Sequence, residues 1–125
     1  MIAKSGFTLI ELVIVIMILG ALIAIAIPKF TDITTKTAIA ASKANQNSVV
    51  SAFAVYLGEN NGTYPTVAQL AVQLQSAGAS MAAEASGIRF TIAGDNYTIA
   101  TYKDGSCMTP SAATTDVIKC VGDVS

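Results

Sequence analysis

The chain has no histidine and no tryptophan, and it has only two cysteines. Without histidine, the common Ser–His–Asp and Cys–His catalytic arrangements cannot form, and a zinc site would have few ligands. Charged residues make up 12% of the chain, with 7 basic and 8 acidic side chains, which gives no strong signal for nucleic-acid binding. No phosphate-binding loop is present. We therefore expect a protein that is not an enzyme and that uses no cofactor and no metal.

What the sequence does have is a long apolar run over residues 7–27. About 21 residues at roughly 1.5 Å each give roughly 30 Å, the thickness of the hydrocarbon core of a bilayer. Glu11 is the only ionisable residue in this run. A carboxylate in a membrane costs about 2.5–3.5 kcal/mol on insertion scales, which indicates a functional role and a partner. Because the run has no Lys, Arg or His, that partner must come from cleavage or from another molecule.

The segment before the run is short, contains the basic residue Lys4 and ends in Gly6. A secretory signal peptide has its small-residue cleavage site after the apolar region, whereas here the small residue lies before it. Cleavage after Gly6 would leave the apolar segment on the mature protein. It would also create a new α-amino group on Phe7, four residues from Glu11.

The segment Lys4-Ser5-Gly6, followed by Phe7-Thr8-Leu9-Ile10-Glu11-Leu12, resembles the N-terminus of type IV prepilins and of type II secretion pseudopilins. The resemblance continues through Gly20 and Pro28 and fades after Phe30. It implies that a membrane prepilin peptidase cuts between Gly6 and Phe7. It also implies that Phe7 is then N-methylated.

In the family, the carboxylate at the position of Glu11 neutralises the N-terminal amine of a neighbouring subunit, here that of Phe7. Elementary electrostatics agrees, because a buried charge becomes tolerable when it is paired. The resemblance therefore implies a homo-oligomer in the form of a helical filament. Its other implied partners are the prepilin peptidase, the pilus assembly machinery and, before assembly, the inner membrane.

The domain layout follows from the same features. We expect a leader over residues 1–6, a transmembrane and polymerisation helix over residues 7–28, and an exported head over residues 29–125. Lys4 before the span favours a cytoplasmic N-terminus. In an oxidising compartment, Cys107 and Cys120 are expected to form a disulfide. Closing the loop between them should stabilise the folded state by about 3 kcal/mol in the chain-entropy model. The expected locations are the inner membrane before assembly and an extracellular surface filament, or fimbrium, afterwards.

The helix is expected to continue past the apolar run. Gly20 and Pro28 are weak points, so the segment between them is a candidate to melt during assembly. Gly58 is the expected C-cap. The face predicted to pack under a sheet consists of Ile39, Val50, Phe53 and Leu57.

The rest of the chain predicts a small antiparallel sheet. Thr66 to Gln69 has the form of a capping box and begins a short helix that ends near Gly78. Alternating apolar residues predict strands over residues 88–92 and 97–102, a turn at 94–96, and a last strand over 117–121. Residues 79–87 receive no assignment. The expected fold class is α+β, the ladle fold of type IV pilins, in which a long N-terminal helix packs against three to four antiparallel strands.

The sequence therefore predicts a structural subunit of a type IV pilus, used in adhesion, twitching motility or DNA uptake. A major pseudopilin of a type II secretion system is an alternative, because it has the same N-terminal pattern. Pseudopilins usually have a C-terminal calcium loop where this chain has Cys107 and Cys120. A DNA-binding competence pilin is a second alternative, for which only Arg89, Lys103 and Lys119 are available in the part of the head that follows the long helix.

Overall fold

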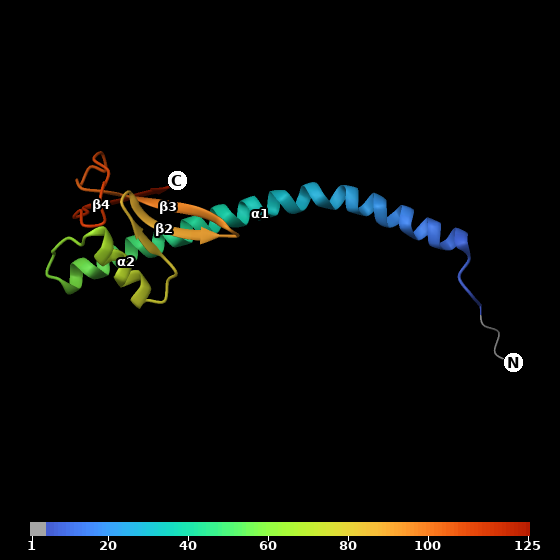
Figure 1. Cartoon of the computed structure of the whole chain (residues 1–125), viewed down its shortest axis with the longest axis horizontal. Helices are drawn as coiled ribbons and strands as arrows, with labels where there is room; N and C mark the ends of the chain where they lie inside the picture. Colours follow the sequence, from blue (N-terminus) through green and yellow to red (C-terminus); the bar gives the residue numbers. More distant parts are fainter. Residues whose placement is uncertain (1–4) are drawn as a thin grey trace. The chain divides into compact units, whose positions relative to one another are not determined.

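The computed structural model describes the backbone of residues 5–125 and the side chains of residues 5–26 and 33–125. Lys4 and the rest of the predicted leader before Ser5 lie outside the described residues. The chain divides into two compact units between Thr37 and Ala38, and we call the unit Ala38–Ser125 the head. The elements in chain order are α1 (Leu9–Glu59), α2 (Val67–Ser76), β1 (Ala82–Glu84), β2 (Gly87–Ile92), β3 (Asp95–Tyr102) and β4 (Cys120–Val124) (Figure 1).

Helix α1 continues well past the apolar run, as predicted. Both Gly20 and Pro28 lie within its bounds, so neither residue ends it. Pro28 has no backbone N–H, and α1 therefore has one fewer main-chain hydrogen bond at that point. Gly20 adds backbone freedom to the same stretch of helix.

In the head, α1 buries a face that differs in part from the predicted one. Val49 is fully buried, and Phe53 packs against the core as expected. Val50 and Ile39 are 46% and 57% exposed, so the prediction was wrong for both residues. The buried Ser42 and Val49 and the partly buried Phe53 follow one another at the helical period, and Val50 and Ile39 fall outside that arc.

The C-terminus of α1 also differs from the prediction. Gly58 lies inside the helix, which ends at Glu59. The left-handed backbone falls on Asn61 and Gly62, with φ of 52° and 81°. The N–H of Gly62 donates to the Leu57 carbonyl at 2.8 Å, which closes the end of the helix. Asn and Gly tolerate this conformation better than other residues, so they terminate α1 in place of Gly58.

The capping box at the start of α2 is confirmed. The N–H of Gln69 donates to Thr66 Oγ1 at 3.2 Å, and the N–H of Thr66 donates to Gln69 Oε1 at 2.9 Å. Helix α2 ends at Ser76, two residues before Gly78. It turns its apolar side inward, with buried Val67, Leu70, Ala71 and Leu74.

The head contains one antiparallel sheet with the strand order β1-β2-β3-β4. Strand β2 pairs with β3, with Ile92 opposite Asp95. Ala93 and Gly94 join them with φ of 53° and 96°, the mark of a tight two-residue hairpin turn. The predicted turn at 94–96 was placed too late, because Asp95 and Asn96 already belong to β3.

Two strands were not predicted correctly. Strand β1 lies in the unassigned segment, where its short, Ala-rich sequence gives little alternation to detect. Strand β4 covers Cys120–Val124, not residues 117–121. Ile118 is fully buried, but its N–H donates to the Pro65 carbonyl at 2.9 Å. The apolar run therefore indicated the burial of Ile118 correctly, but within the predicted range only residues 120 and 121 belong to the strand.

The core of the head lies between the sheet and the two helices. Fully buried side chains come from each layer: Val49 of α1, Leu70 of α2, Ile88 of β2 and Ile99 of β3. Gly87 lets β2 approach β3 closely, because a Cβ there would overlap the Ile99 carbonyl oxygen. The predicted α+β class, with a long apolar N-terminal helix and a four-stranded antiparallel sheet, is confirmed.

Candidate functional site

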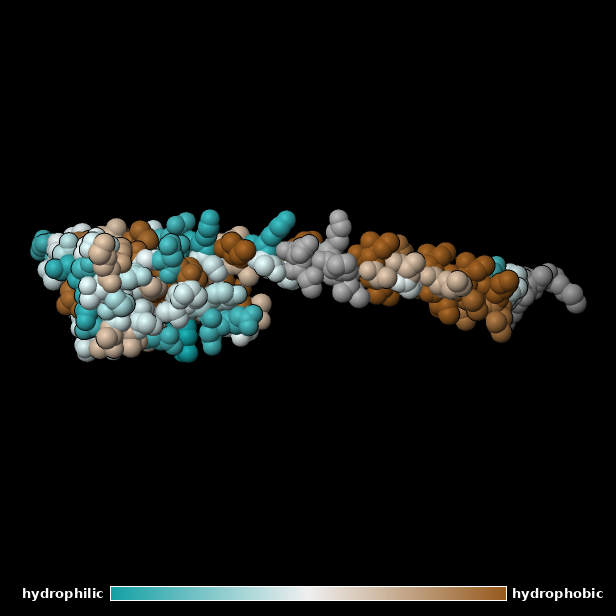
Figure 2. Space-filling model, turned by 90° about the horizontal axis from the view of Figure 1, so that it is seen from above, coloured by the Kyte–Doolittle hydropathy of each residue, from teal (hydrophilic) through white to brown (hydrophobic). Residues whose placement is uncertain are grey.

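The N-terminal part of α1 exposes a long and mainly apolar surface. Among the described residues, Leu9–Ala26 is the one segment whose length and composition suffice to cross a membrane, and the subunit buries 0% of it. Leu9 is 80% exposed and Met17 is 70% exposed. Apolar side chains, brown in Figure 2, cover most of the visible face of this segment. Such a surface needs an apolar partner, either lipid tails or other helices.

Glu11 lies in the first turn of α1. The N–H and the Oγ1 hydroxyl of Thr8 both donate to Glu11 Oε2 at 2.9 Å. In return, the N–H of Glu11 donates to Thr8 Oγ1 at 3.3 Å. These reciprocal bonds form a capping box, so Glu11 stabilises the start of its own helix. This role was not predicted from the sequence, although Thr8 and Glu11 have the same spacing as Thr66 and Gln69.

The capping box uses one oxygen of the carboxylate. Within the part of the chain that the structure describes, Oε2 of Glu11 accepts both bonds from Thr8, and no Lys or Arg forms an ion pair with it. The positive end of the helix dipole favours a negative charge here but does not neutralise it. Glu11 therefore presents a carboxylate that has room for a donor from another molecule.

Gly6 and Phe7 precede α1 in non-helical, exposed chain. Phe7 is 87% exposed, and a Cβ built on Gly6 would meet nothing within 4 Å. The peptide bond between them is therefore open to a peptidase as far as the described residues are concerned. Cleavage at this bond and methylation of Phe7 stay predictions.

Gly20 and Pro28 were predicted to act during assembly, as weak points of the helix. A Cβ on Gly20 would meet nothing within 4 Å, so no packing contact inside the described part of the subunit requires glycine there. Their proposed function as weak points of the helix stays a prediction.

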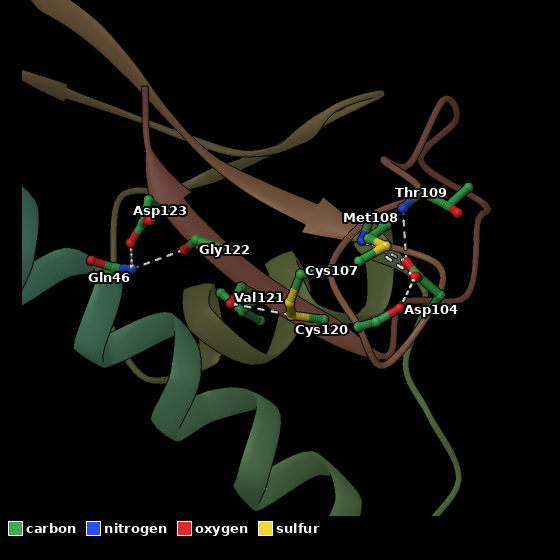
Figure 3. Close-up of a disulfide and its surroundings, with 10 residues drawn as sticks. Gln46, Asp104, Cys107, Met108, Thr109, Cys120, Val121, Gly122 and Asp123 are labelled. Atoms are coloured by element: carbon green, nitrogen blue, oxygen red, sulfur yellow. Dashed lines mark hydrogen bonds between the residues drawn. A yellow bond between two sulfur atoms is a disulfide. The ribbon is translucent and has the colours of Figure 1, made fainter.

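The predicted disulfide is present. Cys107 and Cys120 are bonded, with their Cα atoms 5.5 Å apart, and the bond closes the segment between β3 and β4 (Figure 3). We call residues 104–120 the disulfide loop. This bond anchors the start of β4 beside the end of β3, where Tyr102 pairs with Cys120.

Asp104 holds one end of the disulfide loop (Figure 3). Its carboxylate accepts the N–H groups of Met108 at 3.1 Å and Thr109 at 2.8 Å, and the Ser106 hydroxyl at 2.5 Å. The bond from Ser106, followed by the bond from Thr109, lowers the pKa of Asp104 because both favour the charged carboxylate. The carboxylate oxygens of Asp104 thus accept hydrogen bonds from donors of the disulfide loop itself.

Asp116 holds the other end in the same way. It accepts the N–H groups of Ala112 at 2.7 Å and Ala113 at 3.1 Å, and Lys103 Nζ lies 3.7 Å away. The bond from Ala112 is the largest cause of the lowered pKa of Asp116, and Ala113 and Lys103 add to it. The disulfide loop is therefore held by one covalent bond and two carboxylates.

The cations considered for nucleic-acid binding each have a partner inside the head. The partners are Glu84 at 3.1 Å from Arg89, Asp116 at 3.7 Å from Lys103, and the Tyr64 ring at 5.8 Å from Lys119. Among the described side chains of residues 5–26 and 33–125, no three His, Cys, Asp or Glu residues gather in a way that would hold a metal ion.

Comparison with known proteins finds a family match in the N-terminal part of the chain and similarity to pilus proteins. Residues 1–27 match the family described as the prokaryotic N-terminal methylation motif. The type IV narrow pilus major component PilA5 of Thermus thermophilus is 46% identical over 66 residues, which are 53% of this chain and 56% of that protein. Two fimbrial proteins of Pseudomonas aeruginosa are each 57% identical over 37 residues, 30% of this chain and 24% of theirs.

The chain thus aligns with little more than half the length of PilA5 and about a quarter of the fimbrial proteins. No solved structure matches it significantly. The segment that matches the methylation motif includes Gly6, Phe7 and Glu11, the residues from which the resemblance was first drawn. Together, the N-terminal methylation motif and the similarity to these pilins support the recognition of the chain as a type IV pilin.

Proposed function

We propose that this chain is a structural subunit that polymerises through its N-terminal helix into a type IV pilus. The observation that supports this most strongly is the apolar segment Leu9–Ala26, of which the subunit buries nothing and which has one carboxylate, Glu11, in its first turn. An ordinary membrane anchor has no use for that carboxylate, whereas a helix that must dock against copies of itself does.

The docking chemistry follows from Glu11 and Phe7. After cleavage between Gly6 and Phe7, the α-amino group of Phe7 is a cation at the end of an apolar segment. Inside a filament, this amine and Glu11 of a neighbouring subunit would each be a buried charge in need of a partner. Two unit charges 4 Å apart attract by about 4 kcal/mol at an effective dielectric constant of about 20. The pair therefore sets the register in which one subunit docks on the next.

The capping box makes this pairing compatible with an intact helix. Thr8 donates to Oε2 of Glu11, which orients the carboxylate at the first turn of α1. The other oxygen, Oε1, is then available to the neighbour's Phe7 amine. In this arrangement Glu11 stabilises its own helix and recognises the neighbouring subunit at the same time.

The proposed layout has three parts: the leader over residues 1–6, the membrane and polymerisation segment over 7–28, and the exported part over 29–125, which includes the head. A prepilin peptidase removes the leader, and the pilus machinery then moves the subunit from the inner membrane into the filament. The apolar helix and the pilin matches fit a membrane-anchored precursor and a surface pilus. The local pairing of Arg89, Lys103 and Lys119 weighs against DNA binding as the main activity.

The proposal is tested by analysing surface filaments sheared from cells that produce the full chain. Intact-mass measurement should find a subunit that starts at Phe7 and is heavier by one methyl group. Cells without the prepilin peptidase should retain the full-length chain in the membrane and produce no filaments. A filament subunit that starts at Met1, or the absence of this chain from surface filaments, contradicts the proposal.

A further inference from the structure

We propose that Asn61 is a site of spontaneous deamidation and that a backbone hydrogen bond at the end of α1 controls how fast it reacts. The inference concerns the head alone and does not depend on the proposed function. The reaction needs no enzyme and no reactant besides water and its hydroxide ion.

Asn61 differs from the other asparagines in the residue that follows it. Only Asn61 is followed by glycine, whereas residues with side chains follow Asn45, Asn47, Asn60 and Asn96. Glycine has no Cβ to hinder the approach of its own nitrogen to the preceding side chain, and its backbone rotates more freely than that of other residues. In an unfolded chain, the junction between Asn61 and Gly62 is therefore the most reactive of these junctions.

The reaction is an attack within the chain. The backbone nitrogen of Gly62 loses its proton to hydroxide and forms a bond to Cγ of Asn61. The bond from Cγ to Nδ2 then breaks, ammonia leaves, and a succinimide ring closes. Water adds to either carbonyl carbon of the ring and opens it. The products are aspartate and isoaspartate at position 61, each with a negative charge that asparagine lacks.

The folded head leaves the Asn61 side chain free to react. Asn61 is exposed, and its amide has no hydrogen-bond partner within the part of the chain that the structure describes. A Cβ built on Gly62 would meet nothing within 4 Å, so water reaches the junction. The neighbouring Asn60 differs, because its Nδ2 donates to the Tyr56 carbonyl at 2.9 Å and so holds that amide against the helix.

The nitrogen of Gly62, in contrast, is engaged. Its N–H donates to the Leu57 carbonyl at 2.8 Å. The proton that the reaction must remove therefore lies in a hydrogen bond. The same bond fixes the left-handed backbone of Asn61 and Gly62, with φ of 52° and 81°. The attack on Asn61 must therefore wait until the last turn of α1 opens.

Such an opening is frequent, because helix ends open locally with far less free energy than the whole domain. The net strength of an ordinary backbone hydrogen bond corresponds to a factor of about two to ten between closed and open forms. Asn61 should thus react about two- to tenfold more slowly in the folded head than in the unfolded chain. The hydrogen bond slows the reaction and does not prevent it.

The junction between Asp104 and Gly105 has a similar sequence but should stay intact. An aspartate reaches the same ring only if its carboxyl group loses water, and a charged carboxylate is a poor electrophile. Asp104 accepts the N–H groups of Met108 at 3.1 Å and Thr109 at 2.8 Å, which favour its charged form. The structure therefore distinguishes two junctions that look alike in the sequence.

Conversion of Asn61 should loosen the end of α1. The new carboxylate lies two residues from Glu59, which accepts the Nε2 amide of Gln73 from α2 at 3.1 Å. A negative charge is unfavourable at the C-terminal end of a helix. Isoaspartate also adds a main-chain carbon before the nitrogen of Gly62, so the bond to Leu57 does not re-form in the same geometry. The modification is therefore a permanent mark that accumulates with the age of the protein.

Peptide mapping over time tests the site. The purified full chain, with its disulfide intact, is incubated at mildly alkaline pH in water enriched in the heavy oxygen isotope. One sample is folded in detergent micelles, and a second is unfolded in urea. Asn61 should give aspartate and isoaspartate that contain heavy oxygen, ahead of Asn60, and about two- to tenfold faster in urea. An unreactive Asn61, faster conversion of Asn60 or Asp104, or equal rates in both samples overturns the inference.

A substitution in the last turn of α1 tests the control by the hydrogen bond. Gly58 lies inside the helix, and a Cβ there would meet nothing within 4 Å, so Gly58→Ala should stabilise this turn. Deamidation of Asn61 and amide hydrogen exchange of Gly62 should both slow by the same factor, up to about fivefold. In urea, the variant should react at the wild-type rate.

Gly20→Ala is the matched control, because it makes the same replacement in α1 far from Asn61 and also meets nothing within 4 Å. It should leave the deamidation of Asn61 and the exchange of Gly62 unchanged. If Gly58→Ala slows the exchange of Gly62 but not the deamidation of Asn61, or changes neither rate, the hydrogen bond does not control the reaction. Equal slowing of deamidation by Gly20→Ala leads to the same conclusion.

Discussion

Removing the disulfide should destabilise the head by an amount that the loop itself determines. Cys107 and Cys120 are separated by 13 positions, and crosslinking a loop of this size contributes about 3 kcal/mol in the chain-entropy model. The effect arises mainly in the unfolded chain, which the bond restricts. Cys107→Ser/Cys120→Ser should therefore lose about 3 kcal/mol while keeping the same strands and helices.

The magnitude is large for a small unit such as the head. One kcal/mol shifts the Tm of a domain of this size class by about 4–8 °C, so the double variant should melt roughly 12–24 °C lower. The assay is thermal denaturation of the full chain in detergent micelles, followed by circular dichroism. Reductant should lower the Tm of the wild-type protein to that of the double variant and leave the double variant unchanged.

A loss below about 0.5 kcal/mol would refute this reasoning. It would mean that the hydrogen bonds to Asp104 and Asp116 already hold the loop, or that the unfolded chain gains little freedom when the bond is absent. Asp104→Asn in the double-variant background separates these two explanations, because it removes the negative charge of one of the two carboxylates that the first explanation invokes.

Three smaller perturbations test other parts of the structure. Thr8→Ala should destabilise the start of α1 by about 1 kcal/mol and speed amide exchange in its first turn, and Thr8→Ser should not. The pKa of Asp104 is lowered in the folded head, so its stabilisation is complete above the unfolded pKa and is lost as pH falls through the lowered value. The amides of Met108 and Thr109 should therefore lose protection, relative to intrinsic exchange rates, in acid, and Asp104→Asn should reduce their protection at neutral pH as well. Gly20→Ala should stabilise the helix by up to about 1 kcal/mol and reduce filament yield at an unchanged membrane level, and a normal yield would remove Gly20 as a weak point.

The strongest sequence patterns predicted the structure well because their physical causes are local. The capping box at Thr66 and Gln69 and the alternation of residues 88–92 need no information from distant parts of the chain. The disulfide was predicted as easily, because two cysteines in a domain that is expected to be exported to an oxidising compartment form a disulfide. The fold class and the disulfide could therefore be predicted from the sequence.

The errors occurred where tertiary contacts decide the outcome. The run at residues 117–121 has the composition of a strand. However, the N–H of Ile118 donates to the Pro65 carbonyl, so pairing with β3 starts only near Cys120. Likewise, Val49 and Val50 are chemically identical, and only the orientation of α1 under the sheet decides that Val49 is buried.

The capping role of Glu11 was missed for another reason. The sequence Thr8-Leu9-Ile10-Glu11 has the required spacing, but a carboxylate in an apolar run was interpreted by its membrane cost and not by its local partner. The structure shows that Glu11 bonds to Thr8 and still has an oxygen to offer. A complete test must therefore separate the negative charge of Glu11 from its hydrogen bonds to Thr8.

Glu11→Gln makes that separation, because glutamine also serves as the acceptor of a capping box but has no charge. The measurement is the yield of sheared filaments relative to the amount of subunit in the membrane, compared with Glu11→Ala and with Thr8→Ala. Leaving the Phe7 amine unpaired costs about 3–5 kcal/mol per interface, more than a hundredfold in association. We predict that Glu11→Gln and Glu11→Ala insert normally and form almost no filaments, while Thr8→Ala still forms them. Filaments of Glu11→Gln at wild-type yield would contradict the claim that the charge of Glu11 docks one subunit on the next.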